Sequence, residues 1–298
     1  MDIAKYEAFL KIIERGGFSQ AAEDLGYTRS ALSKMIGSME AEIGFPLVKR
    51  THSGIALNEE GTLVLPLIRS LVNDHHRLEE TYGAITGVLR GKIRIGCFPT
   101  LAYLLVPDII KGFKAKYPYV QIEVIEEHSL PQLENWLKQG VIDIAFISRE
   151  KHHAYDWYEV MEDPYVALLP NDHELTKSTV IPVEMLKEYR LILFKTHEGY
   201  DQDMVKFKHL SRNGEEMYGT NSAAFMTKMV ETDNCIGLMP LSVAEDVATH
   251  RPVVYQKLDE KVVRHVGFAL RENEIVSLAL RKFQQYLKTK FSTEKDNF

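Results

Sequence analysis

The chain has 298 residues, of which 45% are hydrophobic and 26% charged, and its formal net charge is −6. This length is too great for one ordinary core and predicts two or three domains. The composition predicts a soluble globular protein. The net charge argues mildly against nucleic acid as a partner of the whole chain, although a local basic surface can still bind phosphates.

Cysteine usage and the N-terminus indicate the compartment. Cys97 and Cys235 lie far apart, without CxxC or Cys/His spacing, so neither a disulfide framework nor a zinc site is indicated. Both lie in apolar, strand-like runs, and we expect buried structural thiols. The N-terminus is amphipathic and carries acids, unlike a signal peptide, and no apolar stretch reaches transmembrane length. We therefore expect a cytoplasmic location and no membrane partner.

Residues 3–57 predict three helices and a hairpin. The first helix covers residues 3–14 and stops at Gly16-Gly17. Ser19 is expected to cap a second helix that ends at Gly26. Thr28 is expected to cap a third helix, whose buried stripe consists of Leu32, Ile36, Met39 and Ile43. Residues 45–48 and 55–57 then bracket a basic turn, which predicts a two-stranded wing.

The outer face of the third helix is small and polar, so it can approach base edges and phosphates closely. The candidate DNA contacts are Ser19, Thr28, Arg29, Ser30, Ser33, Lys34, Lys49, Arg50 and His52. The alternative is a three-helix bundle that does not touch DNA, because residues 1–60 carry seven Lys/Arg and nine Asp/Glu. Within residues 28–53, however, four basic residues face only two acids.

A long helix is expected from Asn58, a good N-cap, to about Thr86. Its apolar stripe includes Leu63, Leu67, Leu71 and Leu78, as in a helix that pairs with another helix, so we expect dimerisation through it. Pro66 should bend this helix or shift its start. His75-His76 suggests a metal site, but adjacent helical residues point to different sides, so we expect a solvated surface. Gly87 and Gly91 mark the next boundary.

Strands and helices alternate from Lys92 onward. Residues 92–98, 120–127 and 142–148 read as strands, and 101–117 and 130–140 as helices, which implies a parallel sheet covered by helices. A second unit of the same kind follows. A late strand at 264–270 and a helix at 275–291 are expected to pack back on the first unit. The result is two lobes joined by two crossover strands.

Polar residues follow several of these strands, where ligands bind in open parallel sheets. The candidate effector contacts are Pro99, Thr100, Ser129 and Ser148 in the first lobe, and Lys195, Thr196, Asn221 and Ser222 in the second. Each of the Ser, Thr and Asn residues also has a simpler interpretation as a helix cap that touches no ligand. Thr100 opens a helix and could hold a carboxylate with free backbone N–H groups.

Residues 18–50 closely resemble the N-terminal signature of LysR-type transcriptional regulators. The resemblance rests on Ala21-Ala22, the Ser-Ala-Leu-Ser at 30–33, the Glu-x-x-Ile-Gly at 40–44 and the closing Arg50. The family usually has Ser-Gln where this chain has Thr28-Arg29, a departure that puts site preference in doubt. It usually has Leu-Phe at 47–48, where Val48 trims a core aromatic residue. Residues 91–100 and 139–146 resemble the family's effector domain more loosely.

The resemblance implies a multidomain protein. Residues 1–58 would form an all-α winged helix-turn-helix domain, and 59–90 a linker or dimerisation helix with a hinge. Residues 91–298 would form a two-lobed α/β effector domain of the type-2 periplasmic-binding-protein kind, with lobe I at 91–162 and 267–298 and lobe II at 163–266. The implied partners are double-stranded DNA, a small-molecule effector for which an organic anion is a candidate, RNA polymerase, and a second or further copies in a homodimer or homotetramer. No cofactor or metal is expected.

Two other classes of protein were weighed. A solute-binding protein is opposed by the N-terminal helices and by the lack of a signal peptide. An enzyme on a two-lobed α/β scaffold is opposed by the lack of a phosphate loop, HExxH, GxSxG or zinc deaminase signature. The sequence therefore predicts a transcriptional regulator in which an effector between the lobes alters DNA binding through the linker helix.

Overall fold

The computed structural model describes residues 2–51, 54–85, 87–148, 155–196, 199–200, 202–205, 207, 210, 218–233, 235–271 and 276–295. Its first part contains α1 (Ile3–Arg15), α2 (Phe18–Leu25), α3 (Arg29–Ile43) and the antiparallel hairpin of β1 (Val48–Thr51) and β2 (Gly54–Leu57). The three helices bury one small core that includes Phe9, Ile12, Leu32 and Met39. This is the helix-turn-helix domain with a wing that the sequence predicted.

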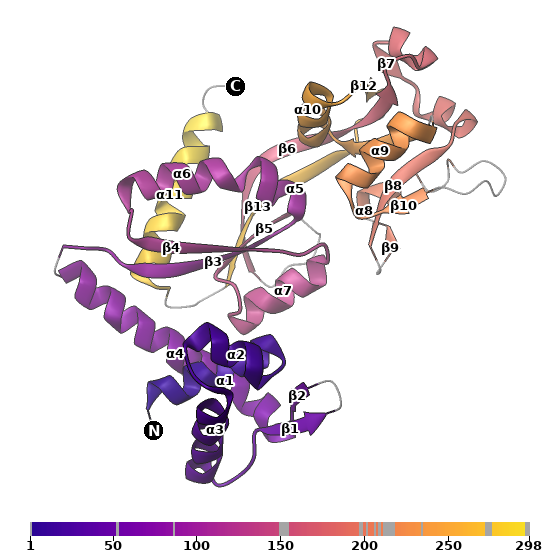
Figure 1. The fold of residues 1–298 in the computed structure, drawn as a ribbon. Coiled ribbons are helices and arrows are strands. Elements are labelled where there is room, and N and C mark those ends of the chain that lie inside the picture. Colours follow the sequence, from indigo (N-terminus) through magenta and orange to yellow (C-terminus); the bar gives the residue numbers. More distant parts are fainter. Residues whose placement is uncertain are drawn as a thin grey trace.

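The linker helix α4 (Glu59–Ile85) packs Leu65 and Ile68 into that core and then runs beneath the effector domain (Figure 1). It starts at Asn58, whose Oδ1 accepts a hydrogen bond from the Gly61 N–H at 2.7 Å. The expected shift of its start by Pro66 is wrong. Pro66 is exposed in the third turn, and the helix continues through it.

The effector domain begins with β3 (Gly91–Cys97), α5 (Pro99–Leu104), α6 (Val106–Lys116), β4 (Val120–Glu126), α7 (Leu130–Gln139) and β5 (Ile144–Ser148). Strand β3 is parallel to both β4 and β5, as predicted. The single helix expected over 101–117 is two helices that meet at Leu105. The break follows from Pro107, which lacks an N–H and is tolerated only in the first turn of a helix.

The second unit is built around β8 (Leu191–Thr196), parallel to β10 (Tyr218–Thr220) and to β11 (Ile236–Pro240). Its helices are α8 (Gln202–Val205), α9 (Ala223–Asp233) and α10 (Leu241–His250), and 3-10 turns cover Glu174–Lys177 and Val183–Glu188. Smaller strands complete it: β7 (Val180–Ile181), β9 (Gly199–Tyr200) and β12 (Val253–Leu258).

Two long antiparallel strands, β6 (Tyr155–Pro170) and β13 (Val263–Arg271), join the units, and α11 (Leu278–Lys295) packs back on the first. The strand order is β10-β8-β11-β6-β13-β5-β3-β4. Each unit has its own apolar core, one around Phe113, Phe146 and Phe283 and the other around Leu186, Leu193 and Phe207. Figure 1 shows these two lobes with β6 and β13 between them. Among the described helices, none is long and apolar enough to cross a membrane.

Candidate nucleic-acid interface and effector site

Helix α3, whose outer face is expected to contact DNA, starts directly after its predicted cap, Thr28. Thr28 Oγ1 accepts a hydrogen bond from the Ala31 N–H at 3.1 Å and lies 3.1 Å from Ser30 Oγ. This cap fixes the first turn, where Arg29 and Ser30 are exposed, and Lys34 is exposed one turn later. Ser33 is half-buried. The N-terminal half of α3 therefore presents two cations and short hydroxyl groups to solvent.

The wing is anchored to α3 by a carboxylate. Glu40 Oε1 accepts hydrogen bonds from the N–H groups of Leu47 and Val48 at 2.7 and 3.2 Å. On the other side, a Cβ on Gly54 would lie 2.4 Å from the carbonyl oxygen of Gly16, so the close approach and a φ of +133° require glycine. These contacts fix the hairpin beside the reading helix.

Four of the expected DNA contacts come from outside α3 and its N-cap. Lys49 is exposed on β1. Arg50 is described by its backbone alone, and His52 lies outside the described residues. Ser19 is not the N-cap of α2, because that helix starts at Phe18 with Gly17 in the cap position and no side-chain cap. Phe18 packs against the core of this domain, and the helix starts two residues earlier than expected.

An exposed apolar stripe runs along α4. The exposed fraction is 76% for Leu63 and 70% for Leu67, and Leu71, Leu78, Tyr82 and Ile85 continue the stripe. The opposite face of α4 packs against the first lobe. There Glu80 is buried, and its carboxylate accepts hydrogen bonds from the Ala279 N–H at 3.2 Å, the Ser277 hydroxyl and the Lys92 N–H. Burial raises the pKa of Glu80 despite these hydrogen bonds.

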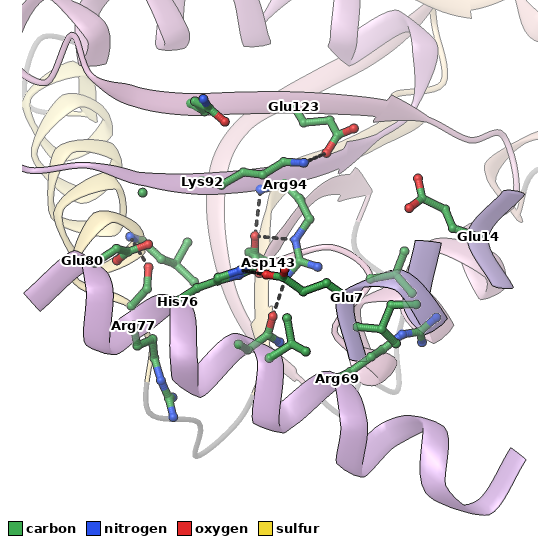
Figure 2. A pocket seen from close by; sticks show the side chains of 18 of the residues that line it. Glu7, Glu14, Arg69, His76, Arg77, Glu80, Lys92, Arg94, Glu123 and Asp143 are labelled. Atoms are coloured by element: carbon green, nitrogen blue, oxygen red, sulfur yellow. Dashed lines mark hydrogen bonds and ion pairs between the residues drawn. The ribbon is translucent and has the colours of Figure 1, made fainter. Parts of the chain in front are cut away.

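A cavity of about 1190 Å³, lined by charged, polar and apolar side chains, lies between α1, α4 and the first lobe (Figure 2). Across it, the Arg94 guanidinium pairs with Asp143 at 2.7 Å and donates to Asn73 of α4 at 3.3 Å. Arg69 of α4 donates to Gln139 Oε1 of α7 at 3.0 Å. None of these side chains was predicted from the sequence as part of a site. Charged residues on a predicted helix or strand give no signal of partners that lie 21 to 70 residues away.

A buried ionic cluster joins the lobes where β6 and β13 cross. Arg264 Nη2 lies 2.7 Å from Asp163 Oδ2, and the two side chains are 7% and 1% exposed. Asp163 also accepts hydrogen bonds from the N–H and hydroxyl of Ser242 at the start of α10. Arg264 Nη1 reaches the hydroxyl of Thr100 in the first lobe at 3.5 Å. The sequence predicted Thr100 but neither Arg264, Asp163 nor Ser242.

Two polar atoms near this junction are buried and have no hydrogen-bond partner among the described residues. They are Arg264 Nε and Ser148 Oγ. Ser148 ends β5 and pairs with Val266, two residues from Arg264 on β13. Pro99 occupies the first turn of α5 beside Thr100. Unsatisfied buried groups of this kind are costly unless a ligand or solvent completes them.

The remaining expected effector contacts are more dispersed. Ser129 is buried, and its hydroxyl accepts the Gln132 N–H, so it caps α7. Ser222 accepts the Phe225 N–H at 3.2 Å and caps α9 in the same way. Lys195 and Asn221 are exposed, and the side chain of Thr196 lies outside the described residues. For Ser129 and Ser222 the capping role is therefore observed.

Both cysteines are fully buried free thiols. Burial, with a smaller effect from Glu126, raises the pKa of Cys97 to about 12. Burial and Asp233 raise that of Cys235 to about 11. A thiol held protonated in an apolar core is a poor nucleophile. The expectation of buried structural thiols is confirmed.

Comparison with known proteins decides the family. The model of the bacterial regulatory helix-turn-helix protein, lysR family, matches residues 3–62, and the LysR substrate binding domain matches residues 86–292. The chain belongs to the LysR family of transcriptional regulators. It is thus a DNA-binding regulator with an effector-binding domain, and not an enzyme, as the sequence predicted.

Relatives of this LysR-type regulator match along nearly the whole chain. The HTH-type regulator YvbU of Bacillus subtilis is 25% identical over 99% of this chain and 100% of its own. A probable hydrogen peroxide-inducible genes activator of Mycobacterium leprae is 24% identical over 98% of this chain and 95% of its own.

Solved structures confirm the fold. A full-length OxyR variant from Pseudomonas aeruginosa is 18% identical with a TM-score of 0.73, covering 97% of this chain and 95% of that one. CbnR complexed with its target DNA is 16% identical with a TM-score of 0.66, covering 97% and 99%. Both likenesses place the winged domain, linker helix and two-lobed domain in one architecture.

Proposed function

We propose that this regulator reads its operator with the exposed face of α3 and the adjacent wing. The observation that carries this is the capped N-terminal half of α3, which presents Arg29 and Ser30 in its first turn and Lys34 in its second turn to solvent. The wing adds Lys49 on β1. Helix dimensions suit the major groove, and cations beside it suit the flanking phosphates. The proposed contacts are Ser19, Thr28, Arg29, Ser30, Ser33, Lys34, Lys49, Arg50 and His52.

Electrophoretic mobility shift with the DNA upstream of the chain's own gene tests this reading. We expect a discrete shifted band that survives excess unrelated DNA and weakens steeply with salt. The variant Ser30→Glu places a negative charge on the exposed face of α3 without touching the core, and it should weaken or abolish the shifted band. No shift at low salt across many promoter fragments, or an unchanged shift with Ser30→Glu, would contradict the proposal.

The apolar stripe of α4 supports a dimer formed through this helix. The stripe extends over most of α4, and its leucines are too exposed to belong to the core of one chain. A tetramer, formed by further contacts between dimers, is the larger assembly that the family resemblance implies. DNA reading also supports a cytoplasmic location, and RNA polymerase is the further partner that transcription regulation implies.

We place the effector between the lobes, at the junction of Thr100, Ser148 and Arg264. The supporting observations are the unsatisfied Ser148 Oγ and Arg264 Nε and the contact from Arg264 to Thr100. Guanidinium and hydroxyl donors suit an organic anion. Pro99, Ser129, Lys195, Thr196, Asn221 and Ser222 are the other contacts proposed from the sequence.

The proposed mechanism is a population shift. An effector that hydrogen-bonds to both Arg264 and Thr100 favours one orientation of the two lobes about β6 and β13. The first lobe passes this change to α4 through Glu80 and Arg94, and the paired α4 helices reset the spacing of the two reading heads. The domain division proposed from the sequence, with its boundaries at residues 58 and 90, fits this scheme.

A further inference from the structure

Two adjacent histidines on α4 lie closer together than the sequence predicted. Ring nitrogens of His75 and His76 and a carboxylate oxygen of Glu79 all lie within 4.8 Å of one another. The ring centroids are 6.0 Å apart. The two side chains remain exposed, as expected for a solvated surface. Glu79 follows them by four and three residues, so its carboxylate can reach both rings on the same side of the helix.

A second element contacts one member of this group, His76. Glu7 of α1 has its Oε1 atom 2.8 Å from His76 Nε2. Glu7, His76 and Glu79 all line the cavity between α1, α4 and the first lobe. Figure 2 shows the side chains of Glu7 and His76 meeting inside it. The cavity gives a hydrated ion both a route and the space for water ligands.

One nitrogen of this group lacks a partner. His75 Nδ1 is buried and has no hydrogen-bond partner among the described residues, and the nearest Glu79 oxygen is 4.0 Å away. That separation is too long for a hydrogen bond. It is the separation that two ligands of one metal ion approach, since bonds of about 2.0–2.2 Å in a tetrahedral site place neighbouring ligand atoms roughly 3.4 Å apart.

We propose that His75, His76 and Glu79, joined by Glu7, bind one divalent transition-metal ion of the Zn²⁺ or Ni²⁺ class. Two imidazoles with carboxylates suit these borderline metals, whereas Mg²⁺ and Ca²⁺ prefer oxygen ligands alone. All four side chains are at least a third exposed, so small rotations can close the remaining separation. The ion would tie α1 of the DNA-binding domain to the linker helix.

Calorimetric titration of the tag-free, chelator-treated full chain with ZnCl₂, NiCl₂ and MgCl₂ tests the site. We expect one Zn²⁺ or Ni²⁺ per chain at this site and weak or no Mg²⁺ binding. His75→Ala and Glu79→Gln should each weaken Zn²⁺ binding about tenfold or more, since even indirect support of a ligand is worth roughly 10- to 100-fold. Among the described residues, His75 and Glu79 have an ion-pair contact with each other and none with α1, and both side chains are at least a third exposed, so both variants should fold.

The control variant is His265→Ala. His265 lies in the other exposed group of His and Glu side chains, with Glu159 and Glu162, and its loss should leave the α4 site unchanged. Zn²⁺ affinity that falls with His265→Ala but not with His75→Ala would overturn the assignment, as would the absence of saturable binding.

The link to α1 has its own readout. Zn²⁺ should raise the melting temperature of the unmodified chain, because an ion bound only to the native state stabilises it. The shift should be smaller with Glu7→Gln, and it should also be smaller with His75→Ala, in proportion to the weaker Zn²⁺ binding of that variant. An equal shift in the unmodified chain and Glu7→Gln would show that the ion sits on α4 alone and would overturn the bridge.

Discussion

Lys34 tests the reading face at the scale of one side chain. It is exposed on α3, and the structure gives it no carboxylate partner within the described residues. Lys34→Ala should weaken operator binding and reduce the slope of log K against log salt by about 0.9 for one lost phosphate contact. Lys138→Ala, which removes an exposed lysine of α7, is the control for net charge. Equal slopes for the two variants would contradict a phosphate contact by Lys34.

Thr100 tests the effector site at the same scale. Thr100→Val keeps the side-chain shape but removes the hydroxyl that Arg264 approaches. The net loss of one hydrogen bond is about 1 kcal/mol, or roughly a fivefold weaker response to an effector found by thermal-shift screening of the chain. DNA affinity without effector should stay unchanged. A parallel loss of DNA binding would show that Thr100 is structural.

Local capping could be predicted for single residues, whereas long-range pairing could not. Thr28 and Asn58 cap their helices as predicted, because a cap depends on neighbours within three residues. Ser19 fails as a cap because packing of Phe18 decides where α2 starts. Asp163 and Arg264 are 101 residues apart, and only the antiparallel register of β6 and β13 brings them together.

Glu80 couples the linker helix to the first lobe, and its protonation gives a test at the scale of elements. Its pKa is raised, chiefly by burial, above the ordinary value of 4.5. The folded state therefore favours the protonated form. The stability that this group contributes is fully present below its unfolded pKa and is lost as pH rises through the higher folded value.

Glu80→Gln removes this titration while keeping an oxygen acceptor for the Ala279 N–H. Relative to the variant, the unmodified chain should lose melting temperature as pH rises from about 4.5 to 7. Melting curves at closely spaced pH values measure the difference. A difference that is constant with pH would contradict the role of burial. Gly91 has to be glycine at this contact, because a Cβ there would lie 2.3 Å from Glu80 Oε1.

The stripe on α4 predicts the oligomeric state. Leu71→Glu places a charge in the middle of the stripe, where a paired helix would have to bury it. Light scattering after size exclusion should show a smaller assembly at the same concentration. Phe225→Glu, on the exposed face of α9, is the matched control and should leave the mass unchanged. An unchanged mass for Leu71→Glu would move the dimer contact elsewhere.

Periodicity predicted the elements better than their interruptions. The alternation of strands and helices predicted the parallel order of β3, β4 and β5, because a helix between two strands returns the chain to the same end of the sheet. The break between α5 and α6 was missed, and the expected shift of the start of α4 by Pro66 was wrong. Both depend on whether neighbouring elements can accept the proline, which the local sequence does not record.

For the whole molecule, the order of elements along the chain implied two lobes and a separate reading head, and the structure shows both. The contacts that seat the linker helix on the first lobe were beyond prediction. The contacts join Asn73 of α4, Arg94 of β3 and Asp143 of the loop before β5. Nothing in the local sequence around any of the three distinguishes it from a surface residue. Signal transmission depends on such contacts, so the sequence could identify the parts of the switch but not their joint.

The contacts between α4 and the first lobe can be tested by mutation. The double variant Arg69→Ala/Asn73→Ala removes the α4 donor to Gln139 and the α4 acceptor of Arg94, but leaves Arg94 paired with Asp143. The linker helix should then detach from the first lobe more often. We expect a larger radius of gyration in solution scattering and faster amide hydrogen exchange in the middle of α4.

In the double variant, operator affinity without effector should stay within about twofold, because α3 and the wing are unchanged. The effector-induced change in operator affinity should become smaller, because coupling requires a contact that differs between the two states. Lys92→Ala removes one positive charge from the same cavity but leaves the contacts of Arg69 and Asn73 intact, and it is the control. If the double variant keeps the full effector response, the signal must bypass these contacts and run through Glu80 and the residue 87–91 hinge alone.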